Sequence, residues 1–179
     1  MANGPYAHAE GQNTKAITSN SGSVAPHAEG IGTQATNQAA HAEGYRTTAN
    51  GWISHAEGNG TVASGVNSHA EGQLCKSVGE NSHAEGVSTT ANGKYSHSAG
   101  CYTIANGESQ TVIGTMNVAD TTSLFIIGNG EGRTRSNAMT VDKVGQIALP
   151  STGSLKIGNI VLDEAKLQKI INFIDSIEG

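Results

Sequence analysis

Along most of the chain, small side chains alternate with polar ones. One half-unit is Ser-His-Ala-Glu-Gly at residues 54–58, and the other is Thr-Thr-Ala-Asn-Gly at residues 47–51. A period of two is typical of β-strands, so Ala, Ser and Thr should face inward and His and Glu should share the outer face. A helix is disfavoured because glycine recurs every seven residues, and each costs about 1 kcal/mol in a helix interior. Large apolar residues at heptad positions, which a coiled coil requires, are missing.

The tetrapeptide His-Ala-Glu-Gly occurs six times, and a seventh copy is altered to His97-Ser98-Ala99-Gly100. From His27 onward each copy starts 14 residues after the one before, whereas the first gap, from His8, is five residues longer. Such a period indicates stacked repeats. We therefore predict a β-solenoid over residues 1–114, with about eight coils rising roughly 38 Å at about 4.8 Å per coil.

Two irregularities qualify the period. The five extra residues fall within 17–26 and predict a loop that bulges from one coil. Residues 2–8 match residues 49–55 in phase, so we expect the chain to start in mid-coil and to be the C-terminal piece of a longer protein.

After Gly114 the period is expected to stop. Residues 138–141 and 146–149 predict one hairpin, and residues 155–157 and 160–162 predict another, within a small β module at 115–162.

A helix is predicted at 163–179, with Asp163 as its N-cap. About 14 residues are marginal for an isolated helix. We expect three copies to pack about an axis, although the helix could instead fold onto its own β module. The apolar stripe that would form this trimerising contact is Leu167, Ile170, Ile171, Ile174 and Ile177.

Composition narrows the classes of function. Gly accounts for 24 of 179 residues and aromatic residues for 4%, so only a thin core of small side chains is available. The net charge is -5, and no basic cluster provides a footprint for nucleic acid. The sequence has no run of about 18 apolar residues, which a membrane-spanning helix would need, so we expect no membrane insertion. Cys75 and Cys101 lie at different phases of the repeat, which indicates free thiols.

The repeat resembles the YadA-like head repeats of trimeric adhesins, whose unit reads roughly Ser-Val-Ala-Ile-Gly followed by Ser/Thr-x-Ala-x-Gly. Residues 54–58 match with His for Val and Glu for Ile, and residues 110–114 (Gln-Thr-Val-Ile-Gly) revert toward the family form. The resemblance implies a left-handed parallel β-roll and a homotrimer in which the His/Glu face meets its neighbours. Residues 124–142 and 157–167 also resemble modules of phage tail-fibre and tail-appendage proteins, which favours a phage origin.

The outward His and Glu residues are the candidate site. We favour their pairing across subunits as hydrogen-bonded partners; ion binding by convergent ligands and a solvent-exposed ladder are the alternatives. We assign no metal, cofactor or catalytic residue and expect no enzyme, because a catalytic site is a local constellation, whereas these residues recur in every coil. The predicted trimer-interface ladder is His8, Glu10, His27, Glu29, His41, Glu43, His55, Glu57, His69, Glu71, His83, Glu85 and His97.

Five aromatic residues are expected at exposed corners, where they could stack on sugar rings, anchor a protein partner or pack against a neighbouring subunit. A column of threonines alternates in phase with the inward Ala residues, so we expect it to be buried. The aromatic residues are Tyr6, Tyr45, Trp52, Tyr95 and Tyr102, and the threonines are Thr33, Thr47, Thr61, Thr89 and Thr103.

These features predict a structural and receptor-binding (adhesion) part of a trimeric phage tail fibre or appendage, located in the virion. Its partners would be two further copies of the chain and a host cell-surface receptor such as a glycan. The alternatives are a head fragment of a bacterial trimeric adhesin on the cell surface and the non-catalytic stalk of an enzyme-bearing tail appendage.

Overall fold

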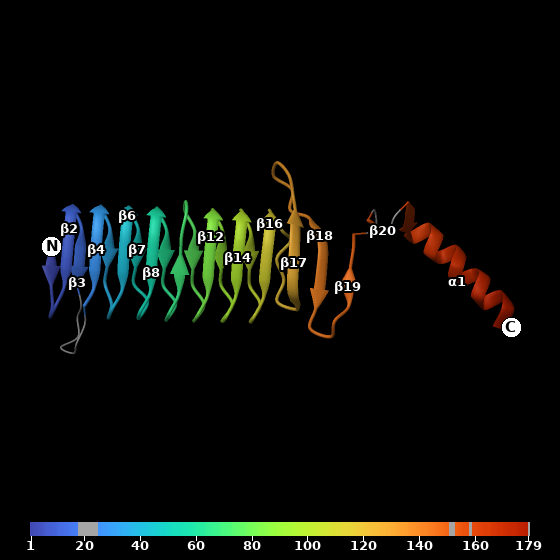
Figure 1. Ribbon diagram of the computed structural model, residues 1–179, viewed down its shortest axis with the longest axis horizontal. Coiled ribbons are helices and arrows are strands. Elements are labelled where there is room, and N and C mark those ends of the chain that lie inside the picture. Colours follow the sequence, from blue (N-terminus) through green and yellow to red (C-terminus); the bar gives the residue numbers. More distant parts are fainter. Residues whose placement is uncertain (18–24, 151–152, 158, 179) are drawn as a thin grey trace.

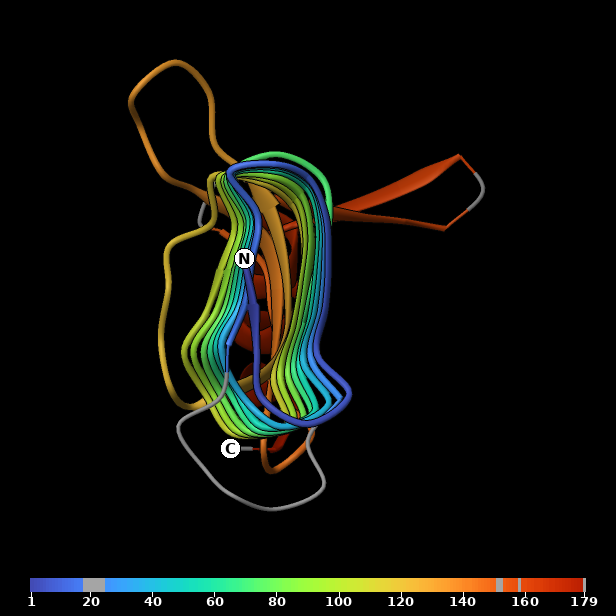
Figure 2. The same ribbon diagram turned by 90° about the vertical axis from the view of Figure 1, so that its left-hand side faces the viewer.

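The coils of this chain stack into a slender parallel β-solenoid. The computed structural model describes residues 1–17, 25–150, 153–157 and 159–178. Successive coils lie side by side along the long axis, and two hairpins and a helix follow at the C-terminal end (Figure 1). Seen along the axis, the coils superpose and enclose only a narrow interior between two sheets (Figure 2). The predicted solenoid is therefore confirmed, whereas the handedness of the coil stays an expectation.

The first sheet is built from short strands, and each of them after the exposed first strand places one small residue in the interior. Its strand order follows every second strand of the chain, and every pairing is parallel. Within the described residues its strands are β1 (Ala2–Asn3), β3 (Lys15–Ile17), β5 (Gln34–Ala35), β7 (Thr48–Ala49), β9 (Val62–Ala63), β11 (Lys76–Ser77), β13 (Thr90–Ala91) and β15 (Ile104–Ala105).

The second sheet carries the His-Ala-Glu-Gly segments. All its pairings are parallel up to β17, and the last two strands are antiparallel. Within the described residues its strands are β2 (His8–Gln12), β4 (His27–Ile31), β6 (His41–Tyr45), β8 (His55–Asn59), β10 (His69–Ala70), β12 (His83–Val87), β14 (His97–Cys101), β16 (Thr111–Thr115), β17 (Ser123–Asn129), β18 (Asn137–Asp142) and β19 (Ile147–Ala148).

Small residues fill the interior, as the alternation predicted. Ala42, Ala49 and Ala56 are fully buried, and so is the whole predicted threonine column. At one corner the hydroxyl of Ser54 donates to the carbonyl of Gly51 (2.8 Å), and Ser68 repeats this contact one coil later. The interior is thin because Ala and Ser leave little room between the sheets.

Glycine sets the distance between coils. Gly86 has φ +104°, and a Cβ built there would lie 2.2 Å from the carbonyl oxygen of Gly100 in the next coil. Any larger residue would therefore push neighbouring backbones apart. This explains why the fourth position of the repeat is glycine in every copy.

The prediction that the period stops at Gly114 is wrong for the second sheet. Strand β17 pairs with β16 in parallel, and Gly128 lies beside Gly114 at the same offset of 14 residues. Val112 and Ile126 take the interior positions that Ala holds in earlier coils, and both are fully buried. The sheet thus has nine parallel strands, its eleven less β18 and β19, so it extends beyond the eight coils expected.

A side chain closes the first sheet. The amide of Asn117 accepts from the backbone N–H of Ile104 (2.7 Å) and donates to its carbonyl (3.0 Å). Asn117 is fully buried. Its side chain thus makes the two bonds that the peptide of a further strand would make, and the edge is satisfied.

Both C-terminal hairpins and the helix form as predicted. Strand β18 pairs with β19, and β20 (Ser154–Ile157) pairs with β21 (Ile160–Asp163). The second hairpin, coloured orange-red, extends sideways from the rod (Figure 2). Helix α1 (Glu164–Glu178) follows, and Asp163 caps it by accepting from the N–H of Lys166 (2.9 Å). The loop predicted within 17–26 falls mainly on residues 18–24, outside the described residues.

Candidate functional site

The imidazole rings of all seven histidines form one stack on the outer face of the second sheet. Neighbouring ring centroids are 4.7–5.0 Å apart. The interplanar angle is at most 9° from His27 onward and 26° between His8 and His27. The stack follows directly from the parallel register, because each histidine pairs with the histidine of the next coil, as His55 does with His69.

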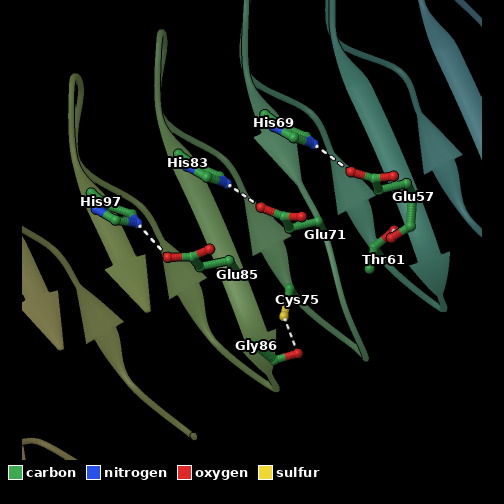
Figure 3. A network of polar contacts seen from close by, with 9 residues as sticks. All are labelled: Glu57, Thr61, His69, Glu71, Cys75, His83, Glu85, Gly86 and His97. Atoms are coloured by element: carbon green, nitrogen blue, oxygen red, sulfur yellow. Dashed lines mark hydrogen bonds and ion pairs between the residues drawn. The ribbon is translucent and has the colours of Figure 1, made fainter. Parts of the chain in front are cut away.

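Glutamates accompany the stack, and each of the last four histidines faces the glutamate of the preceding coil. Figure 3 shows three of these contacts, with the rings and carboxylates in parallel rows. At the N-terminal end the nearest glutamate belongs to the same coil instead, at 4.0 Å for His8 and 3.8 Å for His27. The distances between Nε2 and Oε1 are 4.0 Å for His55–Glu43, 3.2 Å for His69–Glu57, 3.0 Å for His83–Glu71 and 3.2 Å for His97–Glu85.

All of these contacts lie within one chain. The ladder therefore has an internal pairing scheme that the sequence analysis did not anticipate, while pairing across subunits stays a prediction. A parallel in-register solenoid places a glutamate beside the histidine 12 residues later. This offset of 12 residues was the sequence signal that could have revealed the internal pairing.

The ladder is half-buried, and among the described residues some of its buried nitrogens have no hydrogen-bond partner. The His69 and Glu57 side chains are 35% and 33% exposed. The Nε2 atoms of His27, His41 and His55 are buried, and they have no hydrogen-bond partner among the described residues. Buried polar atoms are normally paired, so these nitrogens suggest a contact that a single chain does not supply.

The surroundings of His55 favour its neutral imidazole. Burial lowers the pKa of His55, the charges of His69 and His41 lower it further, and Glu57 and Glu43 only partly oppose this. Six glutamates line up in the same ladder. Adjacent carboxylates about 4.8 Å apart repel by roughly 1 kcal/mol in water and about 3.5 kcal/mol at an effective dielectric constant near 20. The neutral imidazole of His55 can donate a hydrogen bond to these carboxylates, but it brings no positive charge to balance them.

Three places in the ladder bring three ligand atoms together. The groups are His55–Glu57–His69, His69–Glu71–His83 and Glu29–His41–Glu43, and in each one atom from every residue lies within 4.8 Å of the others. The geometry thus selects particular coils that the sequence repeat alone did not distinguish.

The aromatic residues predicted as receptor contacts are exposed but do not form one patch. Tyr6, Trp52 and Tyr95 lie at the corner before the histidine strand, whereas Tyr102 follows it and Tyr45 ends β6. Their exposed fractions range from 41% to 82%. The guanidinium of Arg46 lies over Tyr45, and the ammonium of Lys94 lies over Tyr95, so two rings already have cationic neighbours.

The apolar stripe of α1 remains uncovered. Leu167, Ile170, Ile171, Ile174 and Ile177 are between 42% and 68% exposed, and Phe173 beside them is 66% exposed. Beside the helix runs an apolar groove. Its lining includes Met139, Ile147, Leu149, Leu155, Leu162, Leu167 and Ile171.

Both cysteines are free thiols, as predicted. Cys75 occupies the threonine column and is buried, and its thiol donates to the carbonyl of Gly86 at 3.2 Å (Figure 3). Neither thiol belongs to the ladder.

No family model, curated protein or solved structure matches this chain. In the part of the chain that the structure describes, no helix has the length and apolar character needed to cross a bilayer. The architecture and the ladder are therefore the basis for any functional proposal.

Proposed function

We propose that this chain is the structural and receptor-binding part of a homotrimeric phage tail fibre or tail appendage. The observation that carries the proposal is the shape, a slender rod of in-register coils leading to a helix with an uncovered apolar face (Figure 1). Its work would be projection and adhesion in the virion, without catalysis. The similarity of its repeats to YadA-like head repeats, and of its C-terminal segments to phage tail modules, supports this choice.

The uncovered apolar stripe of the helix supports association with further copies. Five aliphatic side chains of the stripe remain about half exposed in a single chain. Fully burying such a side chain stabilises a protein by roughly 1.5–3 kcal/mol, and a single chain lacks much of this stabilisation. The groove beside α1 offers further apolar surface for a second copy. A thin Ala and Ser interior buries little apolar area in one chain, so association would add what the core lacks.

Sedimentation at micromolar concentration tests the assembly. We expect about 55 kDa, three times the 18.2 kDa chain. Replacing both Ile170 and Ile174 with Asp should abolish that species, because it would place unpaired charge in an apolar seam. Lys166→Asp is a control of similar charge change, since it alters an ion pair with Asp163 outside the stripe. A stable wild-type monomer would contradict the trimer.

Binding assays on the intact assembly test adhesion. A glycan array and a panel of whole bacterial cells should yield at least one ligand. Two double variants then compare the two corners. One combines Trp52→Ala with Tyr95→Ala, and the other combines Tyr45→Ala with Tyr102→Ala. Loss of ligand binding in only one double variant would locate the contact. Failure to bind any glycan or cell would refute the adhesive role and leave the trimer untouched.

A further inference from the structure

The His/Glu ladder combines two features that the proposed fibre role does not use. It gathers imidazole nitrogens and carboxylate oxygens from adjacent coils, and some of its buried Nε2 atoms have no hydrogen-bond partner among the described residues. Every ligand atom concerned belongs to one chain. The inference that follows is therefore independent of the trimer and of the phage assignment.

We propose that the ladder binds divalent transition-metal ions of the zinc type, held between successive coils. The proposed sites are two inter-coil groups that share His69 and a third group around His41. The sequence alone favoured pairing of these residues across subunits, assigned no metal and kept ion binding as an alternative. The first group is His55, Glu57 and His69, and the second is His69, Glu71 and His83. The third group is Glu29, His41 and Glu43.

The separations allow coordination after the side chains rotate. Zinc binds imidazole nitrogen and carboxylate oxygen at about 2.0–2.2 Å, so two ligand atoms of one tetrahedral ion lie about 3.3–3.6 Å apart. The ligand atoms of each group lie within 4.8 Å of one another. Side-chain rotations therefore have to shorten the longest separation by up to about 1.5 Å, which the freely rotating ends of Glu and His side chains allow. In each group three protein ligands leave a fourth position for water.

The donor set selects the class of ion. Imidazole together with carboxylate suits zinc, copper, iron and nickel, whereas Mg²⁺ and Ca²⁺ take oxygen ligands almost exclusively. Metal binding requires an imidazole nitrogen with a free lone pair, and the Nε2 atoms of His41 and His55 have no hydrogen-bond partner among the described residues. A bound cation would also neutralise the repelling carboxylates of the ladder.

His69 limits the number of ions. His69 belongs to two groups, and a neutral imidazole has one nitrogen lone pair, which can coordinate only one ion. The two groups that share it therefore hold one ion between them. With the group around His41, we expect two ions per chain.

Calorimetric titration of the untagged full chain with Zn²⁺ at pH 7.5 tests this. We expect two ions per chain, a higher melting temperature that a chelator reverses, and no binding of Mg²⁺ or Ca²⁺ at the same concentrations. His69→Gln should leave one ion. His97→Gln is the matched control, because His97 stacks in the same column and contacts Glu85 but belongs to none of the three groups. This variant should still bind two.

Two further variants test the thiol and the carboxylates as ligands. Cys101→Thr, which copies Thr115 of the next coil, should bind as the wild type does if the thiol is not a ligand. Glu57→Gln with Glu71→Gln removes the carboxylates without touching a histidine and should also leave one ion, so it serves if His69→Gln folds poorly. Absence of Zn²⁺ binding, unchanged stoichiometry in the folded variants, or equal losses in His69→Gln and His97→Gln would overturn the proposal.

Discussion

Acidification should weaken the fold through His55, near the middle of the imidazole stack. The folded pKa of His55 lies below the 6.5 of the free side chain, mainly because burial disfavours its charged form. Between these two values the unfolded chain binds more protons than the folded chain, so stability falls as pH falls. The His55 contribution is therefore complete above about pH 6.5 and is lost as pH drops toward and through the lowered folded pKa.

The magnitude follows from linkage and from the ring spacing. One proton of difference changes the free energy of unfolding by about 1.4 kcal/mol per pH unit, so His55 costs at most about 1.4 kcal/mol at pH 5.5. Its side chain is 36% exposed, and solvent screening reduces the expected loss to roughly 0.5–1 kcal/mol. Charging two rings 4.7 Å apart would add a repulsion of about 3.5 kcal/mol at an effective dielectric constant near 20, so neighbours should not protonate together.

Urea unfolding at pH 7.5, 6.5 and 5.5 measures this loss, with a chelator present to remove metal ions. His55→Asn should flatten the pH dependence, whereas His8→Asn, at the exposed end of the stack, should keep the wild-type slope. A free energy of unfolding that is constant or rises on acidification, or an unchanged slope in His55→Asn, would refute the reasoning.

Two further predictions concern the solenoid backbone, and chemical unfolding measures both. Gly86→Ala should lower the free energy of unfolding by about 2–5 kcal/mol. Of this, about 1–2 kcal/mol comes from the left-handed backbone conformation and about 1–3 kcal/mol from crowding the next coil. Gly132→Ala is the control: with φ +65° and open space around it, it should lose only the first part. Equal losses would show that coil spacing does not require glycine. Asn117→Ala should lose about 2–4 kcal/mol, because its amide satisfies two backbone groups of β15. Amide exchange at residue 104 that stayed as slow as in the wild type would contradict the capping role.

Local patterns predicted most of this architecture. Strand positions, inward Ala and outward His follow from a period of two, and the hairpins follow from turn residues between apolar runs. The Asp163 cap follows from a similarly short-range preference. These features depend on neighbours in sequence, so a single chain suffices to predict them.

Other features depend on contacts between coils. Ile53 and Tyr95 adopt positive φ, which side chains other than glycine rarely do, because the stacked corners impose one conformation on every coil. The strand at Phe125 joins the solenoid because its backbone register continues, although its bulky side chains break the visible pattern. In the candidate site, the residue types were evident but the diagonal partners were not.

The diagonal pairing also accounts for where the ladder ends. In a solenoid every residue stacks on its own counterpart, and a charged residue therefore repels its copies unless an opposite or donating group lies between them. Each glutamate from Glu43 to Glu85 has a histidine 12 residues later to serve that purpose. The next glutamate position is 99, and a glutamate there would need a histidine at position 111, where the chain has Thr111. Position 99 itself is Ala99. The altered seventh copy is thus the expected terminus of a ladder whose carboxylates depend on the following coil.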